Sequence, residues 1–307
     1  FEPTLRTYMT PKETRQHQLL AYEALVRAQM ERGFWQRARD TIREWQKIQP
    51  ESIQALACLS EIFTYLNAPD QGAVTAEKVL KIDPDRSQCR LMLAEFYQQD
   101  NKQEKAIPHY LYMLEREPNR EALIWGLTDC YLDTNQLDKA EEMAKRHLQL
   151  NPQSVNAIVN LGELELKKGN PEQAEQHFLE VMKREPMVYE ARAGMIKVAT
   201  RLGRLAEAEK LSKDFKGFQQ DLEQLDRLRD VALRQSPRNP SIRFQIAEIF
   251  FRWGDVKKAQ EWAESAHQLS RQHKKTNLLL AKIYEQQGDK ETAAEHLRLA
   301  GVAPSNP

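Results

Sequence analysis

Apolar residues recur at three- and four-residue steps over most of the chain. One stretch carries Ile158, Leu161 and Leu164, and the next carries Phe178 and Val181. A period of 3.6 residues predicts amphipathic α-helices, whereas a strand would alternate at every second residue. Since no segment shows that alternation, we expect an all-α protein.

The helical pattern repeats at a fixed interval of 34 residues. Prolines mark this interval most clearly, at Pro50, Pro84, Pro118, Pro152 and Pro186. A column of Gly and Asn follows the same interval and resumes after one longer gap: Gly33, Asn67, Asn101, Asn135, Gly169, Gly203, Gly254 and Gly288. Gly and Asn accept the left-handed backbone conformation that ends a helix, so this column predicts tight turns between paired helices.

A small residue stands five positions after each predicted turn. This column comprises Ala38, Gly72, Ala106, Ala140, Ala174, Ala208, Ala259 and Ala293. A side chain without bulk lets the second helix of each pair approach the first closely. At Gly72 we expect a slightly weaker unit, because glycine lowers helix stability relative to alanine. Each interval thus predicts a hairpin of two antiparallel helices, and such hairpins must stack into a solenoid to bury their apolar faces.

This arrangement resembles the tetratricopeptide repeat (TPR) family, whose signature pairs Leu-Gly or Leu-Ala with downstream Ala, aromatic and Pro residues. The best match is Leu161-Gly162, Ala174, Phe178 and Pro186. Further matches are Leu93-Ala94, Tyr97, Ala106, Tyr110 and Pro118, and also Leu280-Ala281, Tyr284 and Ala293. The resemblance covers about nine-tenths of the chain. It implies a right-handed superhelical solenoid that holds a protein or peptide segment in a concave groove lined by the first helix of each hairpin.

We place eight repeat units, at residues 11–52, 53–86, 87–120, 121–154, 155–188, 189–218, 240–273 and 274–303. We expect an extended N-terminal segment at 1–10, units one to six over 11–218, an extra helix at 219–239, units seven and eight over 240–303, and a tail at 304–307. The extra helix is predicted because Leu222, Leu225 and Leu228 recur at helical steps within the one longer gap. It serves either as a spacer that shifts the superhelix or as a binding element.

Composition narrows the classes of partner. The 307 residues include 45 Lys plus Arg and 45 Asp plus Glu, so the formal net charge is zero. A neutral chain offers no general electrostatic attraction for nucleic acid or an anionic membrane, and we expect neither as the partner. The charge is uneven, however, with net +3 over 1–50, −8 over 51–186 and +5 over 187–307. Weak self-association through these opposite charges is one hypothesis, limited by screening in salt.

Candidate chemistry is sparse. The seven histidines show no metal-binding spacing, and the three cysteines lie in no CxxC motif. We expect His109, His177 and His296, which occupy equivalent places on second helices, to be solvated surface residues. No nucleophile elbow, phosphate-binding loop or dinucleotide fingerprint occurs. We therefore expect no catalytic residue, no metal and no cofactor, and a protein that is not an enzyme.

One position on the first helices can be followed at steps of 34 residues, and four successive members, in units two to five, are acidic. Residues one helical turn away would face the same groove. The candidate binding residues are Glu61, Tyr65, Glu95, Gln98, Gln99, Trp125, Asp129, Asp133 and Glu163. Carboxylates beside an indole and a phenol suit a Lys- or Arg-bearing segment, through charge-assisted hydrogen bonds and cation–π contacts.

Two interpretations of this acidic column stay open, ligand binding and plain solvation, because charged rows usually face water. Trp125 either faces the groove or packs against the next unit. The function we favour is a non-catalytic scaffold or adaptor that binds a protein or peptide segment in its groove. The alternative is a ligand- or peptide-sensing regulatory domain of a larger protein with a catalytic or signalling partner.

The apolar runs and the first residue of the chain bear on membrane insertion and targeting. No apolar run approaches 18 residues, so we expect no direct membrane insertion. The chain begins at Phe1 and not at Met, which suggests that an N-terminal targeting or anchor segment has been trimmed. The compartment is left open by these observations.

Overall fold

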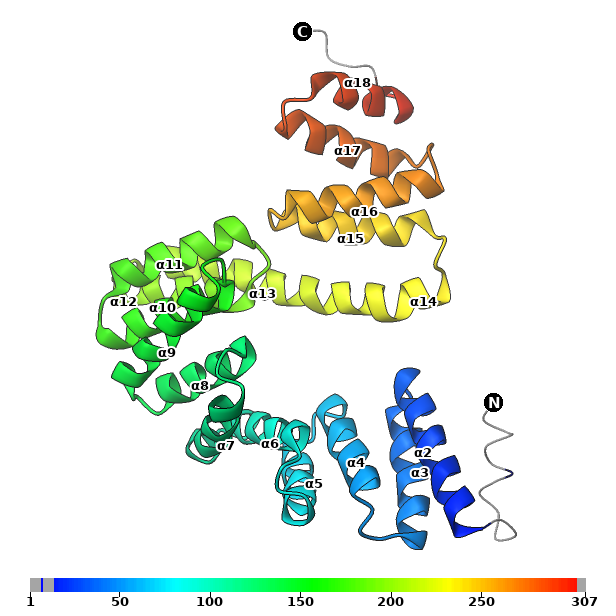
Figure 1. The fold of residues 1–307 in the computed structure, drawn as a ribbon. Helices are drawn as coiled ribbons and strands as arrows, with labels where there is room; N and C mark the ends of the chain where they lie inside the picture. Colours follow the sequence, from blue (N-terminus) through cyan, green and yellow to red (C-terminus); the bar gives the residue numbers. More distant parts are fainter. Residues whose placement is uncertain (1–6, 8–13, 303–307) are drawn as a thin grey trace. The chain divides into compact units, whose positions relative to one another are not determined.

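The computed structural model describes residue 7 and residues 14–302 (Figure 1). All regular structure in this part of the chain is helical, which confirms the predicted all-α class. The predictions for 1–10 and 304–307 fall, residue 7 apart, on residues outside this description. The contacts divide the chain into two compact units, residues 1–160 and 161–307, and each is described by itself.

Unit 1 contains four successive helix hairpins, in which each helix packs against the next along the chain. The hairpins are α2 (Arg15–Glu31) with α3 (Trp35–Ile48), α4 (Ile53–Tyr65) with α5 (Pro69–Ile82), α6 (Ser87–Gln99) with α7 (Gln103–Arg116), and α8 (Glu121–Asp133) with α9 (Leu137–Leu150). The next helix, α10 (Val155–Lys168), crosses the boundary between the units. Each hairpin of unit 1 corresponds to one predicted repeat.

The predicted turn column adopts the left-handed backbone conformation. Asn67, Asn101 and Asn135 have φ of 49°, 55° and 57°, and they are the only non-glycine residues with positive φ in the described part of the chain. The five glycines of the column have positive φ as well. The backbone at these positions therefore confirms the tight turn that the Gly and Asn pattern predicted.

The glycine at position 72 has a packing role that the sequence did not reveal. A Cβ at Gly72 would lie only 2.3–2.6 Å from ring atoms of Phe96, which is 1% exposed. Tyr110 stands in the same relation to Gly126, with the nearest ring atom 2.6 Å from the position of a Cβ. Gly72 therefore makes room for an aromatic side chain, and our expectation that it merely weakens its unit missed this requirement.

Unit 2 continues the hairpins and contains the long gap in the repeat. After α10 come α11 (Pro171–Arg184), α12 (Tyr189–Arg201), α13 (Leu205–Arg227), the π-helical turn η1 (Leu228–Ala232) and α14 (Leu233–Gln235). Two hairpins follow, α15 (Pro240–Arg252) with α16 (Val256–Leu269), and α17 (Lys274–Gln286) with α18 (Lys290–Leu299). The fully buried ring of Phe178 lies against both Gly162 and Gly194.

The residues predicted as an extra helix at 219–239 are helical as far as Gln235, but they do not form a separate helix. They continue the second helix of unit six through α13, η1 and α14. The attachment of this inserted segment to the following hairpin is polar: the Asp221 carboxylate accepts hydrogen bonds from Arg252 Nη1 at 2.7 and 2.9 Å and from Trp253 Nε1 at 2.7 Å. The guanidinium of Arg192 lies 4.7 Å from the ring centre of Phe218 and 4.9 Å from that of Trp253. Asp221 is only 6% exposed, so these contacts fix the inserted segment.

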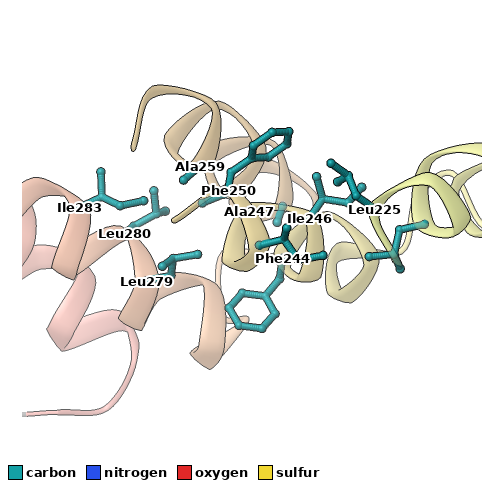
Figure 2. Packing of buried hydrophobic residues seen from close by; sticks show 13 residues of the cluster. Leu225, Phe244, Ile246, Ala247, Phe250, Ala259, Leu279, Leu280 and Ile283 are labelled. Atoms are coloured by element: carbon teal, nitrogen blue, oxygen red, sulfur yellow. The ribbon is translucent and has the colours of Figure 1, made fainter. Parts of the chain in front are cut away.

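An apolar cluster completes the attachment. Figure 2 shows Leu225 of α13 directed toward Ile246 and Ala247 of α15, with Leu280 and Ile283 of α17 on the other side of that helix. Leu280 and Ile283 are completely buried and Leu225 is 4% exposed. The inserted segment therefore shares one core with the last two hairpins.

Candidate functional site

The first helices of unit 1 lie next to one another, since α2 contacts α4 and α4 contacts α6. We use the term first-helix face for the surface of unit 1 that carries Glu61, Tyr65, Glu95, Gln98, Gln99, Trp125, Asp129 and Asp133. These residues include eight of the nine candidate binding residues. The ninth, Glu163, belongs to unit 2.

At its N-terminal end, the first-helix face presents an aromatic pair. Tyr65, at the end of α4, stacks on Trp35, at the start of α3, with ring centroids 3.8 Å apart and planes within 3°. Tyr65 remains 57% exposed. Glu61, one turn earlier on α4, is also exposed. The stacked partner Trp35 lies outside the repeated column, so the sequence pattern did not identify it.

Glu95 is a partly shielded carboxylate of the face. It is half-buried in the middle of α6, and this burial raises the pKa of its carboxyl group, while the charge of Arg120 acts in the opposite direction. A carboxylate that has lost part of its hydration gains more from a cationic partner than a fully solvated one. Half-buried Glu95 therefore has a physical reason to bind a cation that the exposed Glu61 lacks.

A short chain of hydrogen bonds supports the face beneath Glu95. The Tyr110 hydroxyl, which reaches in from α7, donates to Gln98 Oε1, and Gln98 Nε2 donates to the carbonyl of Gly126 at 3.2 Å. Burial, followed by the charges of Glu95 and others, raises the pKa of Tyr110, so the phenol stays protonated as a donor. Gln98 is thus held in place between α6 and α8.

The α8 part of the face combines an indole with two carboxylates. Trp125 is 40% exposed, and Asp129, one turn later, is half-buried. The Asp133 Oδ2 atom accepts a hydrogen bond from Gln103 Nε2 at 3.0 Å, while Gln99 at the end of α6 is exposed. Burial and the charges of Asp129 and Asp133 raise the pKa of the Cys130 thiol to about 12, so this thiol stays protonated.

Glu163 differs from the other acidic candidates because a lysine neutralises it. Lys197 Nζ lies 2.7 Å from Glu163 Oε1, and the two residues are one repeat apart. The pair lines a pocket of about 390 Å³ between α10 and α12, together with Lys167, Arg201 and others. The negative charge that Glu163 would add to the acidic column is therefore offset within unit 2.

The expectation of solvated histidines is wrong for His296 and incomplete for His109. His296 is 8% exposed and lies against other rings, and His109 is half-buried beside Tyr97 with ring centroids 5.9 Å apart. Burial, aided by Arg90, lowers the pKa of His109. This burial could not be predicted from the spacing along the chain, because it depends on side chains of the neighbouring hairpin.

One histidine cluster in unit 1 resembles a catalytic triad only in its residue types. His147 Nε2 lies 3.0 Å from Ser154 Oγ and 3.1 Å from Glu121 Oε2. In a triad the carboxylate and the nucleophile contact opposite nitrogens of the ring, but here both contact the same one. Ser154 Oγ also accepts from the backbone amide of Ala157, so these bonds fasten the start of α10.

In the described part of the chain, no group of three or more His, Cys, Asp or Glu side chains is arranged to hold a metal ion. None of the helices in this part of the chain is both long enough and apolar enough to span a membrane. The three cysteines are free thiols.

Comparisons with known families agree with the repeat pattern. Two tetratricopeptide repeat models match, on residues 99–161 and 275–300, and a model described as the TT21 fifth ARM repeats domain matches residues 155–225. No curated protein matches the chain in sequence. These matches support the resemblance of the chain to tetratricopeptide repeat proteins.

Solved structures show the same fold. A chain of MamA from Desulfovibrio magneticus RS-1, from residue 41 to its end, is 19% identical with a TM-score of 0.51, over 54% of this chain and 93% of that MamA chain. PilW, a type IV pilus biogenesis factor, is 20% identical with a TM-score of 0.53, over 65% of this chain and 92% of PilW. YrrB, described as a TPR protein with an unusual peptide-binding site, is 16% identical with a TM-score of 0.50. The match covers 56% of this chain and 88% of the YrrB chain. The fold class is thus an all-α solenoid of TPR hairpins.

Proposed function

We propose that this chain is a non-catalytic scaffold whose first-helix face binds an extended, Lys- or Arg-bearing segment of a partner protein. The observation that supports this most directly is the succession of Glu61, Glu95 and Asp129 on neighbouring first helices, one repeat apart. An extended segment places alternate side chains on one side, so it can offer cations to several repeats in turn.

The chemistry of the face fits such a segment. Carboxylates form charge-assisted hydrogen bonds with guanidinium and ammonium groups, and the exposed rings of Trp125 and Tyr65 offer faces for cation–π contact. Half-buried Glu95 supplies a site where the dielectric constant is lower than in water, which strengthens the attraction. Glu163 contributes least in this proposal, because Lys197 already pairs with it.

The likeness to YrrB is consistent with peptide binding, because that protein is described as a TPR protein with a peptide-binding site. The identity is only 16%, so the comparison supplies no partner and no residue roles for this chain. The proposal therefore depends on the charge and exposure of the first-helix face alone.

The test is a titration of the full chain with a fluorescent Arg-containing peptide, alongside the same peptide with Glu in place of Arg. We expect the Arg peptide to bind and the Glu peptide not to bind. The variant E95K/D129K should lose at least about tenfold in affinity, since it replaces attraction with repulsion at two central positions. Unchanged affinity in this variant would refute the proposal.

A matched control separates local binding from net charge. The variant E115K/E142K makes the same change in charge on exposed residues of the second helices α7 and α9. We expect its affinity to stay within about twofold of wild type, apart from the general effect of net charge. An equal loss in both variants would mean that the peptide responds to the whole chain's charge and not to the first-helix face.

Self-association could compete with peptide binding, because unit 1 carries acidic excess and the C-terminal third carries basic excess. Sedimentation velocity at low and physiological salt measures this directly. A wild-type oligomer that disappears in E95K/D129K would indicate that the first-helix face binds a second copy of the chain.

A further inference from the structure

His273 holds the start of α17 through an unprotonated ring nitrogen. Its Nδ1 atom accepts from the backbone amide of Thr276 at 3.4 Å and lies 2.6 Å from Thr276 Oγ1. Because Nδ1 is an acceptor, the ring proton resides on Nε2, which donates to Ser241 Oγ of α15 at 3.2 Å. The neutral imidazole therefore caps α17 and joins it to the preceding hairpin.

His296 holds the other helix of the same hairpin. The Asn277 side chain donates through Nδ2 to the carbonyl of Arg271 at 2.8 Å, which leaves its Oδ1 as an acceptor for His296 Nδ1–H at 3.1 Å. The His296 ring lies parallel to Tyr284, with centroids 5.5 Å apart, and edge-on to His267 at 5.1 Å. His267 belongs to α16, so His296 links α18 to both α17 and α16.

Charged groups on the packed helices lie near both rings. Near His273 they are Lys275 on α17 itself and Glu248 on α15, which lines the same pocket. Burial, followed by the charge of Lys275, lowers the pKa of His273.

Around His296 the groups are His267 and Glu264 on α16, Tyr284 on α17 and Glu295 on α18. Tyr284 donates its hydroxyl proton to Glu264 Oε1 at 2.8 Å, so that carboxylate already has a partner. Burial, followed by His267, lowers the pKa of His296 although Glu295 and Glu264 act in the opposite direction.

We propose that the last hairpin, α17 with α18, is an acid-sensitive element that opens when His273 and His296 take up protons. A proton on His273 Nδ1 removes the acceptor that caps α17 and places positive charge at the helix N-terminus, where the helix dipole is also positive. A proton on His296 creates a charge inside an almost fully buried ring cluster beside another imidazole. This inference does not depend on peptide binding by unit 1.

The direction of the pH dependence follows from the lowered pKa values. An unfolded histidine has a pKa of about 6.5, and a folded one with a lower value binds protons less readily than the unfolded chain. The neutral rings therefore stabilise the last hairpin fully above about pH 6.5. This stabilisation decreases as the pH falls from the pKa of the unfolded histidine toward the lower pKa of the folded one. Opening should thus begin in mildly acidic solution.

Hydrogen exchange of the full chain, read by mass spectrometry, tests this locally. After correction for the intrinsic exchange rate, we expect peptides from α17 and α18 to open about tenfold more often at about pH 5.5 than at about pH 7.5. Peptides from α4 and α5 serve as the internal reference, because the repeat at 53–86 contains no histidine. Equal opening of α17 and α18 at the two pH values would overturn the proposal.

Variants identify the responsible rings. In H273N/H296Q, neither side chain titrates, Asn remains a good helix cap, and Gln can still donate to Asn277. We expect its α17 and α18 peptides to lose the pH dependence, whatever their absolute rate of opening. The control H177N, at a half-exposed histidine of α11, should keep the wild-type ratio. Persistence of the pH dependence in H273N/H296Q would contradict the proposal.

A spectroscopic measurement keeps the test decisive if the double variant does not fold. Imidazole ¹⁵N shifts of the wild-type chain report which ring nitrogen carries the proton. At about pH 7.5, His273 should show an unprotonated Nδ1, and the signal should change to the doubly protonated form below about pH 6.5. A proton on His273 Nδ1 in neutral solution would overturn the capping geometry and the proposal with it.

Discussion

Lys197 Nζ lies 2.7 Å from Glu163 Oε1, and the two residues are 34 positions apart, one full repeat. Equivalent positions on α10 and α12 therefore lie side by side in unit 2, as the stepped column on the first helices requires. Because equivalent positions lie side by side, charges of the same sign in this column can act together on a partner, whereas opposite charges pair with each other.

The Glu163–Lys197 pair should contribute little to stability. Lys197 is 56% exposed, and exposed ion pairs are typically worth about 0.2–1 kcal/mol. A double-mutant cycle with E163Q, K197M and their combination, measured by urea unfolding, should give a coupling energy in that range. A coupling well above it would mean that the pair is more desolvated than its exposure indicates.

Two glycine-to-alanine substitutions should have opposite effects. In G194A the new Cβ would lie 2.4 Å from the Phe178 ring, whereas in G217A the nearest atom, on Trp253, is 3.9 Å away. We expect G194A to lower the free energy of unfolding by about 1–3 kcal/mol through overpacking. G217A should raise it by about 0.5–1 kcal/mol, because alanine favours the helix. Urea titrations of both variants measure the signs, and G194A with wild-type stability would contradict the observed packing of Phe178.

Replacing Asp221 of α13 should destabilise the chain more than replacing Asp226 of the same helix. The buried carboxylate of Asp221 accepts from Arg252 and Trp253, whereas Asp226 is exposed and lies 3.5 Å from Arg229. We expect D221N to destabilise the chain by about 1–3 kcal/mol, since a buried charge-assisted bond is lost. D226N should stay within about 0.5 kcal/mol of wild type. Thermal unfolding of both variants measures these changes. Similar losses in the free energy of unfolding for the two variants would argue against the proposed attachment of the inserted segment.

Glu95 should show a conflict between stability and binding. Burial raises the pKa of its carboxyl group, so the ionised carboxylate destabilises the folded state at neutral pH. We expect E95Q to unfold at higher urea concentration than wild type at pH 7, and this advantage to vanish as the pH falls below the unfolded pKa of about 4.3. The same variant should bind the Arg peptide more weakly. A loss of stability in E95Q at pH 7 would show that Glu95 has a stabilising partner.

The hairpins and their turns could be predicted from the sequence, because they depend on residues close together along the chain. The spacing of Gly and Asn identified the left-handed turns, and the small residue after each turn indicated the close approach of the paired helices. These features repeat, so eight weak local signals reinforce one another. The candidate binding residues followed from the same interval, and their role in binding remains a prediction.

The sequence by itself thus determined the helices, their pairing and which residues occupy equivalent positions. Only the tertiary structure decided which of those residues are buried and what they contact: the room that Gly72 leaves for Phe96, the neutral rings of His273 and His296, and the neutralisation of Glu163 by Lys197. The physical reason is that burial and hydrogen bonding depend on side chains from neighbouring hairpins. Their identities vary from repeat to repeat, whereas the local spacing that forms each hairpin stays the same.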